Sequence, residues 1–226
     1  MNFLRKALCI AWKDVLCELR TKETLSSMFV FALLAIVIFN FAFQLRDNDS
    51  ESVGLIAPGV LWVAFTFAGV LGLGRSFARE KDHGCLEGLM LCPVDRSAIY
   101  VGKALGNMAF MLVMEAIALP MFAVFFNLPI LMPSLLLVIL LGTIGFAAVG
   151  TLFSAISVNT KARDVMLPIL FFPIVIPIVI AAVKSTGQIF DGVSFDQSIP
   201  WINLMLAFDV IFLVVSFLSF EYVIEE

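Results

Sequence analysis

Long apolar runs alternate with short polar segments along the whole chain. Six of these runs are close to or above the roughly 20 residues that an α-helix needs to cross a bilayer. The pattern predicts six transmembrane helices, at residues 25–43, 54–74, 98–126, 134–158, 165–183 and 201–220. The fifth contains Pro168, Pro173 and Pro177, which predict breaks in its hydrogen-bond ladder. The sequence leaves open whether these prolines form a hinge or only fit the neighbouring helices.

The N-terminal segment, residues 1–23, has apolar residues that recur at helical spacing, with charged residues on the rest of the helix surface. A helix with this pattern lies along a membrane surface, so we predict an amphipathic interfacial helix here. Its tryptophan is expected at the level of the lipid headgroups. The apolar face consists of Leu4, Leu8, Trp12, Val15, Leu16 and Leu19.

The longest polar interruption, residues 75–103, lies between the second and third predicted spans. Its middle carries an apolar row at helical spacing, which Pro93 ends. A loop that only linked two membrane helices would need no such row. We therefore predict a second amphipathic helix within residues 75–97, at the membrane surface and bound to something outside the membrane. Its apolar row is Leu86, Leu89, Met90 and Leu91, and its acids include Glu80 and Glu87.

The composition supports a membrane protein. Of the 226 residues, 62% are hydrophobic and 14% are charged, whereas a soluble domain of this length has about a quarter charged residues. The chain is therefore expected to form one all-α transmembrane domain over residues 1–226. No segment between the spans is long enough for a nucleotide-binding domain, so we expect that a separate subunit would supply any ATPase and that this chain is a non-catalytic transmembrane subunit.

The basic residues predict the orientation. Twelve of the 14 Lys and Arg residues fall on one side of the six predicted spans, and only Arg46 and Lys184 fall on the other. Because basic residues concentrate on the cytoplasmic side, both termini are predicted to be cytoplasmic. The twelve are Arg5, Lys6, Lys13, Arg20, Lys22, Arg75, Arg79, Lys81, Arg96, Lys103, Lys161 and Arg163.

Few residues suggest chemistry. Glu115 and Asp209 fall within predicted spans, where a carboxylate is costly, so they are candidate functional residues; the alternative is a hydrogen bond to a neighbouring helix. His83 is the only histidine, and we interpret it as a solvated loop residue. We interpret the four cysteines (Cys9, Cys17, Cys85 and Cys92) as small apolar side chains and predict no metal site or catalytic residue.

The order of these features resembles the permease subunits of type-two ABC exporters, and more closely the haem exporter protein B family. The resemblance covers nearly the whole chain, and it includes PGVLW at 58–62, RDVMLPILFFP at 163–173, FDVIF at 208–212 and FEYVIEE at 220–226. It is most specific in residues 77–103. The positions there that fit the family pattern are Phe77, Glu80, Gly84, Leu86, Glu87, Leu91, Pro93 and Lys103.

The resemblance implies a non-catalytic permease of the bacterial inner membrane that serves cytochrome c-type biogenesis. Its expected partners are an ABC ATPase subunit, a haem-handling membrane subunit, a small accessory membrane protein and a second copy of this chain, with no nucleic acid. Residues 80–91 would be the helix that docks on the ATPase. Haem would be the substrate handled or exported to a periplasmic chaperone, and no tightly bound cofactor is expected.

Two other classes stay open at this point. One is an ABC exporter permease for another hydrophobic substrate. The other is a self-sufficient secondary transporter, which would need more intramembrane ionisable groups and an inverted repeat. A membrane enzyme would need a cluster of histidines or carboxylates at one depth, and Glu115 and Asp209 alone are too few.

Overall fold

The computed structural model describes residues 3–44, 50–82, 84–85, 88, 94–128, 132–158, 160, 162–193 and 195–223. Regular secondary structure in these ranges is entirely helical, which confirms the predicted fold class. The long helices are α1 (Phe3–Thr21), α2 (Glu23–Gln44), α3 (Ser50–Asp82), α5 (Arg96–Phe126), α6 (Pro133–Val158), α7 (Arg163–Phe190) and α8 (Phe195–Val223).

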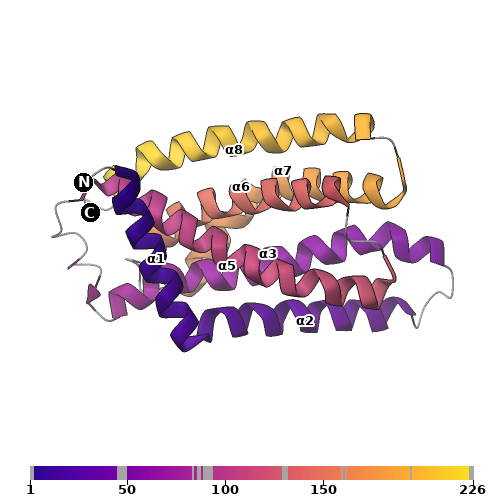
Figure 1. Cartoon of the computed structure of the whole chain (residues 1–226), viewed down its shortest axis with the longest axis horizontal. Helices are drawn as coiled ribbons and strands as arrows, with labels where there is room; N and C mark the ends of the chain where they lie inside the picture. Colours follow the sequence, from indigo (N-terminus) through magenta and orange to yellow (C-terminus); the bar gives the residue numbers. More distant parts are fainter. Residues whose placement is uncertain are drawn as a thin grey trace.

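Six of these helices, α2, α3 and α5 to α8, are long and apolar enough to cross a membrane. They run side by side along the long axis of the molecule, and α1 crosses the bundle obliquely at one end (Figure 1). The start of α1 and the end of α8 lie at this same end, as an even number of spans requires (Figure 1). We call it the α1 end.

Several predicted span boundaries are wrong at their polar ends. α3 continues through residues 75–82, and α7 continues to Phe190, so the interval of residues 184–200 between the last two predicted spans shrinks to the few residues before Phe195. Hydropathy marks where the apolar surface of a helix ends, but polar residues can continue the helix into water. Pro200 does not stop α8, because it lies near the start of the helix and little helix precedes it.

α7 is helical throughout despite Pro168, Pro173 and Pro177, so the predicted breaks are not found. Neighbouring helices pack along it and can satisfy the backbone carbonyls that the prolines leave free. The bundle core around α7 is aromatic and apolar. Trp62 of α3 is fully buried, and its Nε1 donates a hydrogen bond to Thr186 Oγ1 of α7 at 2.9 Å.

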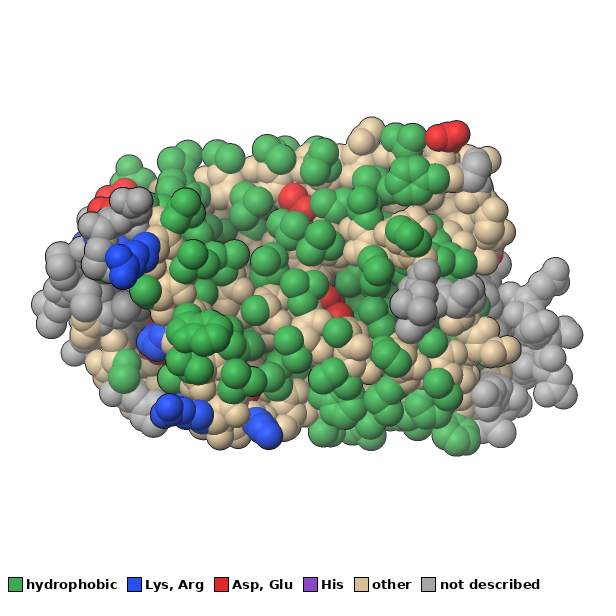
Figure 2. Space-filling view, viewed as in Figure 1, with side chains coloured by type: hydrophobic (Ala, Val, Ile, Leu, Met, Phe, Trp, Pro, Cys, Tyr) green, Lys and Arg blue, Asp and Glu red, His purple; other side chains and the backbone are tan. Residues whose placement is uncertain are grey.

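The outer faces of α2, α7 and α8 leave many large apolar side chains exposed, and green apolar atoms cover much of the face seen in Figure 2. Lipid would cover such a surface in a membrane. The blue basic side chains visible in Figure 2 gather toward the α1 end.

The predicted N-terminal helix is present as α1, and it packs on α5 through Ala7, Ile10 and Ala11. Gly102 permits this contact: a Cβ there would lie 2.7 Å from the Ala7 carbonyl oxygen. The predicted apolar face points away from this contact and is largely exposed, with Trp12 at 64% and Leu19 at 55%. Its position at a membrane surface stays a prediction.

Candidate functional site

A cluster of four charged side chains joins α1, α3 and α5 at the α1 end. Lys103 of α5 is almost completely buried, and its Nζ lies 2.8 Å from Glu80 Oε2 and 3.0 Å from Asp14 Oδ2. Lys13 pairs with Asp14 at 3.2 Å and also contacts Glu80. We call Lys13, Asp14, Glu80 and Lys103 the charge cluster. Two bases face two acids, so the burial of each charge is compensated by a partner from another helix.

Lys13, the most exposed member of the charge cluster, is kept protonated by the acids around it. Burial acts to lower the pKa of Lys13, but the hydrogen bond to Glu80 and the charges of Asp14 and Glu80 outweigh it and raise that pKa. Lys13 is therefore positive at neutral pH. Lys103 Nζ also donates to the carbonyl oxygen of Ser76 at 3.3 Å.

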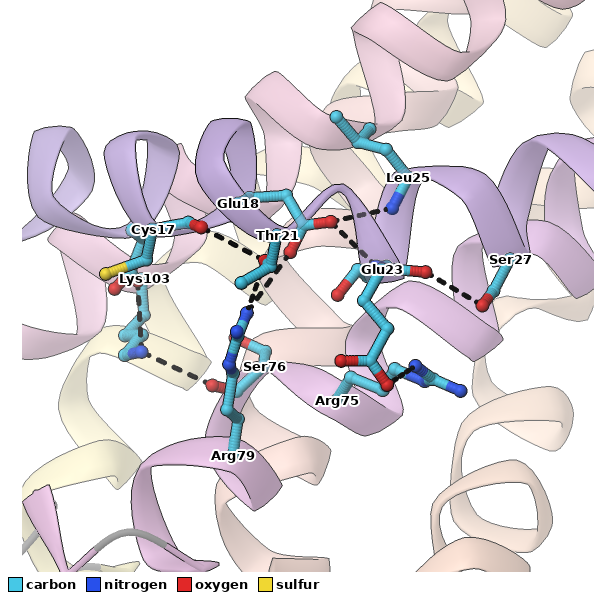
Figure 3. Close-up of polar contacts among 12 residues, drawn as sticks. Cys17, Glu18, Thr21, Glu23, Leu25, Ser27, Arg75, Ser76, Arg79 and Lys103 are labelled. Carbon is cyan, nitrogen blue, oxygen red and sulfur yellow. Dashed lines mark hydrogen bonds and ion pairs between the residues drawn. The ribbon is translucent and has the colours of Figure 1, made fainter.

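Glu18 holds the elbow between α1 and α2. Its carboxylate accepts hydrogen bonds from the backbone N–H groups of Thr24 (2.7 Å) and Leu25 (2.9 Å), which have no partner within the first turn of α2 (Figure 3). Lys22 between the two helices adopts a left-handed backbone conformation, with φ of 55°. The place of Glu18 among the charged residues of the predicted N-terminal helix did not predict this capping role.

Two arginines of α3 attach the elbow to the bundle. Arg79 Nη1 donates to Thr21 Oγ1 at 3.1 Å and lies 3.6 Å from Glu18 Oε2. One turn earlier, Arg75 Nη1 lies 2.8 Å from Glu23 Oε1 (Figure 3). Both arginines fall in the polar interruption predicted to follow the second span, but they lie on the continuous helix α3.

A pocket of about 400 Å³ lies between the elbow, α3 and α5. Its wall includes the charge cluster together with Glu18, Arg20, Arg75 and Arg79, and Gly72 and Phe110 contribute apolar surface deeper in the bundle. A second pocket of about 660 Å³ adjoins α2, α3 and α7. Thr24, Arg75 and Arg79 line both, so this group separates the two pockets.

The predicted docking residues are mostly outside the described residues. Leu86, Glu87, Leu89, Met90 and Leu91 lie there, as does His83, so the apolar row stays a prediction. Glu80 is described, and it lies in the last turn of α3 with its carboxylate against Lys13 and Lys103.

One further link at the α1 end was not predicted. Arg163 at the start of α7 makes two hydrogen bonds, of 2.8 and 2.9 Å, with the carboxylate of Asp82 at the end of α3. These two residues follow different spans in the sequence, and the exposed bidentate pair brings their helix ends together.

The two intramembrane acids are not brought together. Glu115 is buried between α5 and α6, where the Thr143 hydroxyl lies 2.8 and 3.0 Å from its two oxygens. Asp209 of α8 is 3% exposed and has no hydrogen-bond partner among the described residues; it packs against Gly145. Thr143 and Gly145 point to nearly opposite sides of α6, because two residues rotate a helix by about 200°.

The described part of the chain contains no candidate metal site. No group of three or more His, Cys, Asp or Glu side chains lies close enough there to hold a metal ion. The charge cluster and its pocket can instead bind helices together and receive an anion, because five basic side chains face three acidic ones in the pocket wall.

Comparison with known proteins agrees with the sequence resemblance. Heme exporter protein B of Pseudomonas aeruginosa is 26% identical over 189 residues, which are 83% of this chain and 83% of that protein. Heme exporter protein B of Rhodobacter capsulatus is 30% identical over 151 residues, 66% of this chain and 68% of that protein. The model of the CcmB protein family matches residues 5–225. The chain therefore belongs to the CcmB protein family.

Proposed function

We propose that this chain is the membrane permease subunit of an ATP-driven complex that exports haem, or releases it to a periplasmic acceptor, during c-type cytochrome biogenesis. The observation that carries the proposal is the family match over residues 5–225, together with relatives named for haem export along most of the chain. The six membrane-crossing helices suit a permease.

ATP hydrolysis belongs to a separate subunit, which docks on the coupling segment, residues 75–97. Support comes from two residues that flank the apolar row of this segment. Glu80 precedes its apolar row and Lys103 follows it, and their ion pair closes the base of the segment inside the bundle. A movement of this segment on the ATPase would therefore displace α3 and α5 together. Through Asp14 and Lys13 it also reaches α1.

The complex lies in the bacterial inner membrane with the α1 end on the cytoplasmic side. The twelve basic residues predicted for that side support this orientation. The other expected partners are a haem-handling membrane subunit, a small accessory membrane protein and a second copy of the chain. The exposed apolar faces of α2 and α8 offer surface for such membrane partners as well as for lipid.

A clean deletion tests the function. It should abolish covalent haem in c-type cytochromes and leave b-type cytochromes intact, because only the former need haem attached beyond the inner membrane. Haem staining of denaturing gels and difference spectra of membranes measure the two classes. Normal c-type cytochromes in the deletion strain would contradict the proposal, and restoration by the wild-type chain is the control.

A further inference from the structure

We propose that the pocket between the elbow, α3 and α5 is a binding site for haem that arrives from the cytoplasm, with its two carboxylates held by Arg20, Arg75 and Arg79. The inference rests on the proposed function for the choice of ligand. Its place in the molecule rests on the charge, depth and opening of the pocket.

The charge of the pocket wall matches a dianion. Its bases are Lys13, Arg20, Arg75, Arg79 and Lys103, and its acids are Asp14, Glu18 and Glu80, which leaves an excess of two positive charges. Haem carries two carboxylates. Guanidinium groups are suited to receive them, because they present paired N–H donors that match the two oxygens of a carboxylate.

Arg20 and Arg75 are available for a ligand, whereas Lys103 is not, and Arg79 would share its guanidinium between Thr21, Glu18 and the ligand. Lys103 is committed to the buried charge cluster. Arg75 pairs with Glu23, but both side chains are about half exposed or more, at 46% and 65%, so exchanging that partner costs little. Arg20 is exposed and forms no ion pair with any residue in the described ranges.

The pocket also has room and apolar depth for a porphyrin. Its volume of about 400 Å³ falls within the usual range of small-molecule sites. Gly72 lies two turns of α3 inside Arg79, about 10 Å along the axis, and Phe110 adds an aromatic surface from α5. Cys17 and Cys85 also line the pocket with exposed side chains.

The pocket wall takes residues from the polar side of α1 and none from its exposed apolar row. Cys17 lies two residues before Leu19, which places the two side chains about 160° apart around the helix. The exposed apolar row that includes Trp12 and Leu19 therefore faces away from the pocket. This geometry favours a ligand from the cytoplasm over a phospholipid from the bilayer.

The test uses the full chain, purified in lipid nanodiscs and titrated with hemin. Replacement of Arg20 and Arg75 by alanine should weaken hemin binding at least about tenfold, because each change removes a charge-assisted hydrogen bond. Arg5→Ala is the matched control, because Arg5 is an exposed base on the same helix outside the pocket wall, and it should bind like the wild type. Equal affinity in the double variant, or no hemin binding by the wild type, would overturn the site.

Cysteine labelling locates the ligand without any substitution. Cys9 and Cys17 are both exposed thiols of α1, but only Cys17 lines the pocket. Hemin should slow maleimide labelling of Cys17 and leave Cys9 unchanged, as measured by mass spectrometry of the labelled peptides. Equal protection of both cysteines, or protection of Cys17 by phosphatidylglycerol nanodiscs without hemin, would overturn the proposal.

The two proposals fail separately. If the wild-type chain restores c-type cytochromes in a deletion strain but hemin binding ignores the arginines, the site is wrong and the function stands. If the chain does not restore them, the function is wrong, and the choice of haem as the ligand of this pocket is overturned with it.

Discussion

Glu80 Oε2 lies 2.8 Å from Lys103 Nζ, so one ion pair joins the end of α3 to an early turn of α5 across the base of the coupling segment. The Lys103 side chain is only 2% exposed. An ion pair of this kind stabilises little by itself, but the loss of one partner leaves an uncompensated buried charge.

Lys103→Met should therefore destabilise the protein by about 3–5 kcal/mol, because Asp14 and Glu80 then share only Lys13. The measurement is the unfolding midpoint in detergent, followed by tryptophan fluorescence, for which Trp62 is the fully buried reporter. The combined change Glu80→Leu and Lys103→Met should recover much of the loss, since it removes both charges. A double variant as unstable as Lys103→Met would contradict the pairing.

Glu18→Ala should loosen the elbow, because Thr24 and Leu25 lose the acceptor of their N–H groups. Loss of a helix cap costs about 0.5–2 kcal/mol. Glu23→Ala is the control: it removes an exposed pair with Arg75, worth at most about 1 kcal/mol. Thermal unfolding should rank Glu18→Ala as the more damaging change, and the reverse order would contradict the capping role.

Gly102→Ala and Gly59→Ala should change the free energy of unfolding in opposite directions. A Cβ at residue 102 meets the Ala7 carbonyl oxygen and Ile10, whereas one at residue 59 meets nothing within 4 Å. The first should weaken the seat of α1 by about 1–3 kcal/mol, and the second should stabilise α3 slightly. Unfolding midpoints and the rate of trypsin cleavage after Lys6 and Lys13 report the two effects. Unchanged cleavage in Gly102→Ala would contradict the packing of α1 on α5.

Leu86→Ala combined with Glu87→Lys should produce a protein that inserts normally but no longer retains its ATPase. Truncation of a buried anchor costs about 1–3 kcal/mol, and the reversed charge adds repulsion against a basic groove. Co-purification from membranes measures retention, with the insertion level determined by immunoblot. Full retention of the ATPase would remove residues 80–91 from the proposed coupling route.

Single cysteines at Asp82 and Arg163 should react with an impermeant thiol reagent only after the membrane is opened, while cysteines at Asp49 and Asp191 should react from the periplasm. The ion pair between Asp82 and Arg163 requires that these two positions lie on the same side. Periplasmic labelling at Asp82 would reverse the proposed orientation and exclude an ATPase at the α1 end.

Hydropathy was enough to predict the six spans, because a lipid-facing helix must be apolar over the thickness of the bilayer. It was not enough for their polar ends. Residues 75–82 looked like loop because Arg75, Arg79 and Lys81 interrupt the apolar run, yet these long side chains continue α3 and reach out from it.

The candidate site was harder to predict than the fold. Lys103 was counted among solvated cytoplasmic bases, but α1 lies across α5 and buries it against Asp14. Nothing local marks such a pair, because its members are far apart in the sequence and meet only through tertiary packing. Glu18 had a weak signal: an acid a few residues before the start of an apolar helix is a candidate for its N-terminal N–H groups.

The buried position of Lys103 also constrains how the chain is made. α1 carries Lys13, Asp14 and Glu18 and is synthesised before α5, on which it rests, and two spans, α2 and α3, lie between them in the chain. Until α5 is synthesised, α1 lacks its contact with that helix, and only the links of Lys13, Glu18 and Thr21 to α3 can hold it. Lys103 in turn becomes buried only when the earlier helix α1 packs across α5. Insertion of the third span is therefore the step at which the N-terminus locks, and a nascent chain stalled before that span would still have a loose N-terminal helix.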